Sequence, residues 1–379
     1  MTDAGPPPPK RAKFIARDQQ RKLRLVRIGR CLEDKLLPEV CDLVKEYANE
    51  FDGIKLLTRP GDPVLRVGNP VFTSRLAVLD DGNLAFSSHT KVIVLDVNKA
   101  VPKFELLGHT SSVVAVVALK GNKLASGSTD ETVRVWDAHS GECAFVLSGH
   151  ESAVFTLTVL ENGTLASSSK HHVHVWDLSS GSLLKRIQSH MTSEYTVVSL
   201  ANGMLAVGGH PYGTVRVFDV ASGAEVHRHC NLDTSLCLLP DGRLASAAYN
   251  GVVRLWQNMS GSKIEMVGHG SRVNVMIALS NDMLATGSND FSVRVWNINN
   301  ATCVHTLTGH TTPVVALILL PDGKLVSSAF DFMLKVWDWQ TGECVRTIET
   351  ESCIRHLAVL PGCKLVGSGR GNNTIYLWG

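Results

Sequence analysis

The 379-residue chain lacks the signs of several classes of protein. No apolar run approaches the roughly 18 residues that a membrane-spanning helix needs, so we expect no membrane contact. The proline-rich and then basic start does not resemble a secretory signal. The nine cysteines are odd in number and contain no Cys-X-X-Cys pair, which favours a reducing compartment. We therefore expect a cytoplasmic and/or nuclear protein.

Aromatic residues are few as well, but the tryptophans recur with a fixed period. Short apolar runs end in the same way at eight markers: Leu95, Trp136, Trp176, Phe218, Trp256, Trp296, Trp337 and Trp378. The intervals are 41, 40, 42, 38, 40, 41 and 41 residues, which is the period of four-stranded propeller blades rather than of helical solenoids. Asp-Gly and Asn-Gly pairs between the runs indicate hairpin turns.

A histidine precedes most of these markers at a nearly constant distance. The distance is 26 residues for His150, 28 for His190, and 27 for four others: His109, His229, His269 and His310. Two residue types that recur in phase indicate a repeat and not a set of active-site residues.

The chain resembles the WD40 family at these residues. Gly-His stands before each repeat unit, Ser-Gly-Ser lies at 126–128, and Trp136-Asp137 ends a third strand. The resemblance covers about residues 61–379 and implies a histidine, a hydroxyl, an aspartate and a tryptophan joined by buried hydrogen bonds. It implies three complete sets: His109, Ser126, Asp130, Trp136; His269, Thr286, Asp290, Trp296; and His310, Ser327, Asp331, Trp337.

Other units depart from the family pattern. An amide replaces the acid in one set, the acid is missing from a shortened turn in a second, and Phe218 replaces the tryptophan in a third. The first two sets are His229, Ser246, Asn250, Trp256 and His150, Ser167, Trp176. Because a half-satisfied buried network is costly, we expect these blades to be looser.

The fold predicted here is an all-β, eight-bladed WD40 propeller spanning 61–379. The last unit ends after its third strand at Trp378 and needs an outer strand from elsewhere. Residues 64–67 end 16 residues or so before Leu84, in the same phase as Gly108 before Leu124, and so we expect them to pair with the last blade. Seven blades is the alternative if residues 76–95 do not form a true blade.

The basic charge is concentrated ahead of the propeller. Residues 10–30 hold nine basic residues and one acid, a net charge of +8, which leaves −6 for the rest of a chain of net charge +2. We expect residues 1–20 to be a disordered, proline-rich and basic tail. Lys10, Arg11 and Lys13 resemble a nuclear import signal; the alternatives are a solvated tail or phosphate contact with nucleic acid, and we do not expect nucleic-acid binding.

Residues 21–53 are predicted to form a short helical segment. Val40, Leu43, Val44 and Tyr47 fall on one apolar stripe at helical spacing. The segment either packs on the propeller or binds a partner. Leu37-Pro38 is similar to the opening of an F-box, which some WD40 proteins carry to join a ubiquitin ligase, although the segment is too short for a whole F-box.

No residue pattern here indicates catalysis. The sequence contains no glycine-rich phosphate loop, nucleophile elbow or zinc-ligand spacing. His171, His172 and His174 suggest a metal, but His174 matches Arg134 of an earlier repeat, at a position expected to be exposed. Three cysteines occupy equivalent places in separate blades: Cys143, Cys303 and Cys344. We expect no enzyme activity, no metal and no cofactor.

Function is therefore expected on the surface that carries the turns between second and third strands. Aromatic and cationic residues occur in those turns and in the neighbouring loops, as in many binding hot spots: Lys170, Tyr212, Tyr249, Arg272, Phe291, Phe330, Phe332 and Arg370. The leading hypothesis is a non-enzymatic scaffold that binds peptide segments of other proteins, possible ligands being acidic or phosphorylated peptides. The alternatives are a substrate receptor of a ubiquitin ligase and, more distantly, a propeller hydrolase.

Overall fold

The computed structural model describes residues 65–68, 76–99, 101–189, 195–209, 214–230, 233–257, 262–280, 282–362, 364–370 and 374–378. These residues form eight antiparallel sheets of four strands each. The tail predicted over 1–20, the helical segment predicted over 21–53 and the import signal lie outside the described residues. In the described part of the chain no helix is long and apolar enough to cross a bilayer.

Each sheet is one blade, and the first four blades follow the chain in order. Blade one comprises β2 (Leu76–Val78), β3 (Leu84–Ser88), β4 (Lys91–Asp96) and β5 (Val101–Leu106). Blade two comprises β6 (Val113–Leu119), β7 (Lys123–Ser128), β8 (Val133–Asp137) and β9 (Cys143–Leu147). Blade three comprises β10 (Thr156–Val159), β11 (Leu165–Ser168), β12 (His172–Trp176) and β13 (Leu183–Gln188). Blade four comprises β14 (Tyr195–Ser199), β15 (Met204–Gly209), β16 (Thr214–Asp219) and β17 (Glu225–Cys230).

The remaining blades continue this order until the last, which combines both ends of the propeller. Blade five comprises β18 (Asp233–Leu238), β19 (Leu244–Ala248), β20 (Val253–Trp256) and β21 (Lys263–Met266). Blade six comprises β22 (Val273–Ser280), β23 (Met283–Ser288), β24 (Val293–Asn297) and β25 (Thr302–Leu307). Blade seven comprises β26 (Val314–Leu319), β27 (Leu325–Ala329), β28 (Met333–Asp338) and β29 (Glu343–Glu349). Blade eight comprises β30 (Cys353–Leu360), β31 (Lys364–Arg370), β32 (Thr374–Trp378) and β1 (Leu65–Gly68).

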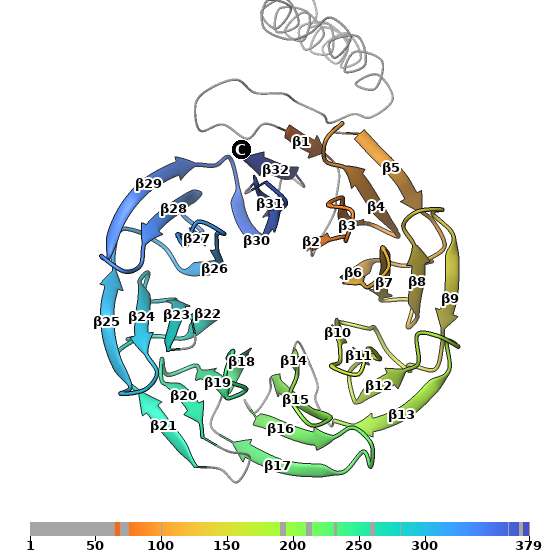
Figure 1. Cartoon of the computed structure of the whole chain (residues 1–379), viewed down its shortest axis with the longest axis horizontal. Coiled ribbons are helices and arrows are strands. Elements are labelled where there is room, and N and C mark those ends of the chain that lie inside the picture. Colours follow the sequence, from red (N-terminus) through yellow and green to blue (C-terminus); the bar gives the residue numbers. More distant parts are fainter. Residues whose placement is uncertain are drawn as a thin grey trace, which may run out of the picture. The chain divides into compact units, whose positions relative to one another are not determined.

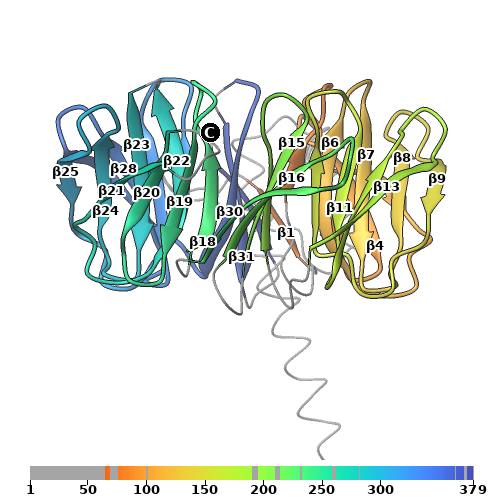
Figure 2. The same ribbon diagram turned by 90° about the horizontal axis from the view of Figure 1, so that it is seen from below.

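The blades form a ring around a central channel (Figure 1). The first strand of each blade lies beside the channel and the fourth lies on the outer rim, as β6 and β9 do in blade two. Seen from the side, the strands run between two faces (Figure 2). The prediction of an eight-bladed all-β propeller is confirmed. The seven-bladed alternative is wrong, because β2 to β5 form a complete sheet.

The ring closes through a strand from the N-terminal side of the propeller. β1 pairs antiparallel with β32, in a register that runs from Leu65 opposite Leu377 to Gly68 opposite Thr374. The sequence placed this outer strand at 64–67, one residue earlier. The pairing covers the edge that β32 would otherwise present to solvent, and an uncovered edge would be a template for aggregation.

The hydrophobic core lies between neighbouring blades. One cluster joins Val94 and Leu106 of blade one to Val116 and Trp136 of blade two. Both faces of the middle strands are therefore buried, so that all five residues of β3 are buried instead of alternate ones. Contact between sheets is close: a Cβ added to Gly127 would lie 2.8 Å from Cγ1 of Val154 in the next blade. This packing fixes each blade against its neighbours.

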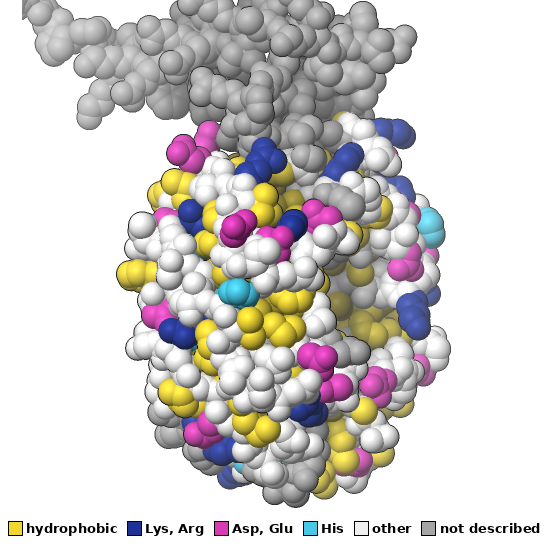
Figure 3. Space-filling model, turned by 60° about the vertical axis from the view of Figure 1, so that its left-hand side comes forward, with side chains coloured by type: hydrophobic (Ala, Val, Ile, Leu, Met, Phe, Trp, Pro, Cys, Tyr) yellow, Lys and Arg dark blue, Asp and Glu magenta, His cyan; other side chains and the backbone are white. Residues whose placement is uncertain are grey.

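The two faces of the ring carry different loops. One face carries the turns between second and third strands together with the loops that follow fourth strands, including His109, His150, His269 and His310; we call it the histidine face. The outer rim is different in character. The space-filling view, which brings forward the side of β25 and β29, shows hydrophobic side chains scattered among acidic and basic ones (Figure 3).

Candidate functional site

Blade two shows how the histidine face is held in place. His109 Nδ1 lies 2.8 Å from Asp130 Oδ2, and His109 Nε2 lies 2.8 Å from Ser126 Oγ. Trp136 Nε1 donates to the same Ser126 Oγ at 2.8 Å. A carboxylate only accepts, so Nδ1 carries the imidazole proton and Nε2 accepts from the hydroxyl of Ser126. The loop, the turn and two strands are thus joined through buried polar groups.

The charges in this network are set by burial and hydrogen bonding. Burial lowers the pKa of His109, against the influence of Asp130, which raises it, and the imidazole is neutral at neutral pH. Burial would raise the pKa of Asp130, but hydrogen bonds from Thr132, the Thr110 N–H and His109 outweigh it and lower that pKa to about 2. The network therefore contains an aspartate anion and a neutral histidine.

Blades six and seven repeat this arrangement. In blade six the distances are 2.8 Å from His269 to Asp290, 2.7 Å from His269 to Thr286, and 2.8 Å from Trp296 to Thr286. In blade seven His310 lies 2.8 Å from Asp331 and from Ser327, and Trp337 donates to Ser327 at 2.8 Å. The structure thus brings together every member of the three complete sets, and all of these groups are occupied within the fold.

In blade three a different residue takes the place of the acid. His150 Nδ1 lies 2.8 Å from Ser169 Oγ, His150 Nε2 lies 2.6 Å from Ser167 Oγ, and Trp176 donates to Ser167 at 2.7 Å. The reason given for a looser blade, a half-satisfied network, is therefore wrong for His150. The turn is one residue shorter, which brings the hydroxyl that follows β11 to the histidine. Sequence reasoning missed Ser169 because it searched only for an acid.

The exposure predicted for the second position of the third strand is wrong. His174 is only 1% exposed, and the equivalent Arg216 and Arg254 are 8% and 6% exposed. The side chain at this position is covered because it lies over the tryptophan of its own blade, as the guanidinium of Arg134 does at 5.9 Å from the Trp136 ring centroid. In blade three the His174 imidazole lies here instead and stacks on His150, with ring centroids 3.9 Å apart.

The buried imidazoles of blade three titrate abnormally. Burial, assisted by the positive charge of neighbouring groups, lowers the pKa of His150 to about 3 and that of His174 to about 4. Neither ring nitrogen of His174 has a hydrogen-bond partner. His172, on the same strand, instead lies 3.2 Å from an Arg186 nitrogen. Among the described residues no group of His, Cys, Asp and Glu side chains could hold a metal ion.

Blade five corrects another prediction. Trp256 donates to Ser246 at 2.9 Å, but His229 belongs to β17 and stacks on the Trp256 ring with centroids 4.0 Å apart. In the complete sets a glycine precedes the histidine, and Gly108 has a φ of 154°, which other residues rarely adopt. Arg228 stands there in this blade, so the chain continues as a strand and carries His229 past the position predicted for it.

The predicted partner-binding residues fall into two groups. Five of them come together on the histidine face of blades five to seven: Tyr249, Arg272, Phe291, Phe330 and Phe332. Lys170 lies apart from them in blade three, where its N–H donates to Ser152. Tyr212 and the side chain of Arg370 lie outside the described residues.

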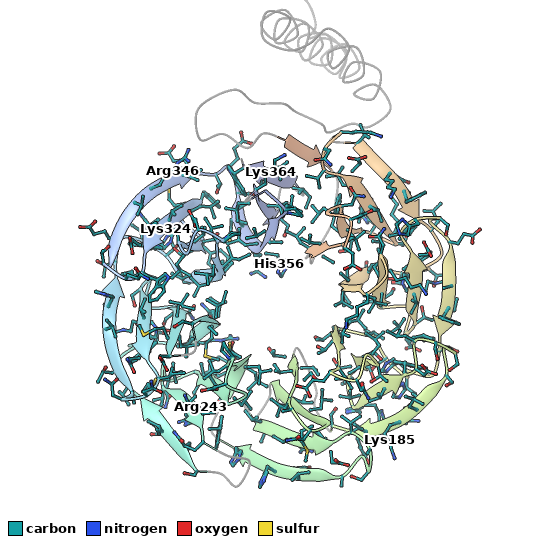
Figure 4. The ribbon with its side chains drawn as sticks, viewed as in Figure 1. Lys185, Arg243, Lys324, Arg346, His356 and Lys364 are labelled. Atoms are coloured by element: carbon teal, nitrogen blue, oxygen red, sulfur yellow. The ribbon has the colours of Figure 1, made fainter. Side chains whose placement is uncertain are left out.

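Two arginines stack on aromatic rings across blade boundaries. The Arg272 guanidinium of blade six lies 4.5 Å from the ring centroid of Tyr249 in blade five. Arg355 of blade eight lies 5.5 Å from the ring centroid of Phe330 in blade seven. Sequence reasoning missed Arg355, because β30 carries no marker at that position and the contact joins residues from different repeats. Lys185 and Arg346 lie on the outer rim, and His356 lies beside the channel (Figure 4).

Two phenylalanines on this face have unfavourable backbone conformations. Phe291 has a φ of 72° and Phe332 has a φ of 61°, whereas Gly251 occupies the same turn position in blade five. Their side chains are 44% and 50% exposed. A bulky residue in the left-handed region is uncommon, and an exposed ring gains little from burial. The fold itself does not account for either residue.

Comparisons with known proteins agree with this architecture. A family model described as WD domain, G-beta repeat matches residues 100–137, 141–177, 224–257, 262–297 and 301–338. The guanine nucleotide-binding protein subunit beta of Schizosaccharomyces pombe is 35% identical over 272 residues, which are 65% of this chain and 89% of that protein. The chain belongs to the WD40-repeat family.

Two further matches mark the limits of that likeness. The F-box/WD repeat-containing protein sel-10 of Caenorhabditis elegans is 50% identical over 52 residues, which are 14% of this chain and 9% of that protein. This chain thus spans less than a tenth of the length of sel-10. The structure of the C-terminal WD40 domain of Sif2 is 17% identical, with a TM-score of 0.73 over 86% of this chain and 99% of that chain, and it supports the fold alone.

Proposed function

We propose that the protein is a non-enzymatic interaction scaffold that binds peptide segments of other proteins on the histidine face of blades five to seven. The observation that carries this proposal is the pair Phe291 and Phe332, which combine an unfavourable backbone conformation with an exposed aromatic ring. A left-handed conformation costs a non-glycine residue roughly 1–2 kcal/mol. Costs of this kind concentrate at functional sites.

The same part of the face holds a buried polar group without a partner. In blade two the hydroxyl of Thr129 donates to Ser111 at 2.7 Å. In blade seven the equivalent of Thr129 is Phe330, and the hydroxyl of Thr312, the equivalent of Ser111, is buried without a partner. Blade seven thus differs from blade two in several ways that disfavour the fold, all of them on one face.

The chemistry of this face suits recognition more than catalysis. The histidine and aspartate pairs are buried and occupied by each other, as at His269 and Asp290, and they do not present a reactive group to a substrate. Exposed aromatic rings next to an arginine are typical of binding hot spots. The positive charge of Arg272 fits an acidic or phosphorylated segment.

A glycine substitution at both phenylalanines tests the proposal. We expect Phe291→Gly with Phe332→Gly to remove a set of partners in affinity capture from cells, because it deletes both exposed rings. Glu131→Gly is the matched control, since Glu131 has the same left-handed conformation in blade two, with a φ of 69°. Unfolding temperatures show that all variants are folded. A partner set that is unchanged by the double substitution would contradict the proposal.

The ubiquitin-ligase alternative depends on Leu37-Pro38, which lies outside the described residues. Sel-10 carries an F-box in its name, but its match covers only 14% of this chain. Deleting residues 1–52 separates the two hypotheses. Loss of ligase subunits from the captured proteins would favour the receptor, whereas an unchanged partner set would favour the propeller face.

A further inference from the structure

The proposed function leaves the chemistry of the bound segment open, and the surroundings of Arg272 narrow it. We infer that blade six binds a segment in which a carboxylate side chain, from Asp or Glu, is close to a large apolar side chain. The carboxylate meets Arg272 and the apolar side chain meets Phe291. This inference rests on the proposed function, because it assigns the ligand of the same face.

The Arg272 guanidinium is held in one orientation. Tyr249 of the preceding blade covers one of its faces at 4.5 Å. Its Nε is buried without a hydrogen-bond partner, and no described residue accepts a hydrogen bond or forms an ion pair with this side chain. The fixed plane leaves the terminal nitrogens to bind a ligand. Two parallel N–H groups in a plane match the two oxygens of a carboxylate.

The charge of Arg272 is not balanced by a neighbouring acid. Asp290 follows closely in the turn of the same blade, but it accepts from His269 and, at 2.7 Å, from the hydroxyl of Ser292. Asp331 of the next blade is bound to His310 in the same way. An arginine whose nearest acids are already occupied attracts an anion from outside the chain.

The amount of positive charge favours a carboxylate over a phosphate. Arg272 is the single Lys or Arg in the described second-to-third-strand turns and histidine loops of blades five to seven. Arg355 lies two blades away, and the labelled Lys185 and Arg346 lie on the outer rim (Figure 4). A phosphate monoester carries about −1.5 to −2 charges at neutral pH and is usually bound by a cluster of cations. One cation matches the single charge of Asp or Glu.

Phe291 places the apolar partner next to the anion. The Asn289 N–H donates to the carbonyl of Arg272 at 2.8 Å, which joins the arginine loop to the turn, and Phe291 follows two residues later. An extended peptide advances about 3.3 Å per residue. The apolar side chain of the ligand is therefore expected within about two or three residues of its carboxylate, with Phe332 in the next blade extending the apolar surface.

Selection from a phage-displayed library of random peptides on the full chain tests this inference. We expect the selected peptides to combine Asp or Glu with a nearby Leu, Ile, Phe or Trp. For a synthetic peptide from that selection, Arg272→Gln is expected to weaken binding at least about ten-fold, because a charge-assisted hydrogen bond is lost. Repeating the selection on Arg272→Glu is expected to replace the acid with Lys or Arg. Glu131→Gly is the control that should leave affinity unchanged.

The outcomes separate this inference from the proposed function. Peptides that depend on Phe291 but neither contain an acid nor respond to Arg272→Gln would overturn the inference and leave the proposed function standing. Phosphoserine in place of the selected acid is expected to bind no more tightly, and markedly tighter binding would overturn the carboxylate assignment. If no peptide is selected, or if binding ignores both Arg272→Gln and Phe291→Gly, the proposed function fails and the inference fails with it.

Discussion

Blades two and seven contain the same buried network but differ in the turn that joins their second and third strands. Histidine, serine and tryptophan have nearly identical distances in the two blades. The turn reads Thr129-Asp130-Glu131 in blade two and Phe330-Asp331-Phe332 in blade seven. The aspartate is kept, and the residues on either side of it change from polar to aromatic.

The difference separates residues that build the blade from residues that use it. In blade two the hydroxyl of Thr129 is hydrogen-bonded within the fold. In blade seven the Phe330 ring contacts Arg355, and Thr312 is left without a partner. The network fixes the turn backbone, so the flanking side chains can change without loss of the blade. Blade seven accepts a cost in stability at the positions where we propose that it binds.

The largest expected effect comes from breaking the network that the two blades share. Ser126→Ala and Ser327→Ala each leave a tryptophan N–H and a histidine nitrogen without a partner in a buried site. We expect each to lower the free energy of unfolding by about 3 kcal/mol, measured by urea unfolding. Ser126→Thr should lose much less, because Thr286 fills this role in blade six. Clearly unequal losses at Ser126 and Ser327 would show that turn and network are coupled.

Acid is expected to separate blade three from the complete blades. The folded-state pKa values of His150 and His174 are lowered to about 3 and 4, from 6.5 in the unfolded chain, so the unfolded state binds protons first. Stability contributed by these neutral histidines is complete above about pH 6.5 and is lost as the pH falls toward the folded values. Each loses about 2 kcal/mol between pH 6.5 and 5.

Hydrogen exchange by segment checks this pH dependence. Amides of β11 and β12 should lose protection at pH 5 before those of β7 and β8, where Asp130, with its pKa of about 2, partly offsets the protonation cost of His109. His174→Arg restores the residue type of blade two and should reduce the difference between blades. Equal protection of blades two and three at pH 5 would show that the buried imidazoles do not control opening.

Much of this fold could be read from spacing, because its repeats are local. The phased histidines and tryptophans predicted eight blades, and the matching phase of Gly68 and Gly108 predicted the outer strand that pairs with β32. The position of His229 was also within reach, since Arg228 replaces the glycine that the loop requires. Reading the histidine without its preceding residue gave the wrong position.

Other features depend on contacts that spacing does not reveal. Ser169 reaches His150 only because the turn is shorter, and the sequence does not show how that hydroxyl is redirected. Arg272 stacks on Tyr249 from a different blade, so the pair becomes visible only when two repeats are placed side by side. Residue types on the candidate face could be predicted, but not the way in which they are combined.

Restoring a hydroxyl in blade seven should make it more like blade two. We expect Phe330→Thr to gain about 1 kcal/mol in unfolding free energy, because Thr312 regains a hydrogen-bond partner. Phe330→Ala is the matched control: it removes the ring without supplying a hydroxyl, so the threonine variant should be the more stable of the two in urea unfolding. If the two variants have the same stability, the partnerless Thr312 is not a cost to this blade.

The smallest expected effect concerns the backbone of Phe332. Phe332→Ala removes the ring but keeps a residue with a Cβ at a φ of 61°, whereas Phe332→Gly relieves that conformation as well. The relief is partly offset by the greater freedom of glycine in the unfolded chain, so we expect the glycine variant to be more stable than the alanine variant by about 0.5 kcal/mol. Thermal unfolding of both, beside Glu131→Ala and Glu131→Gly, measures this difference. A similar gain in both blades would show that left-handed turns are a shared cost of the repeat, and that what distinguishes blade seven is its aromatic side chains and not its backbone.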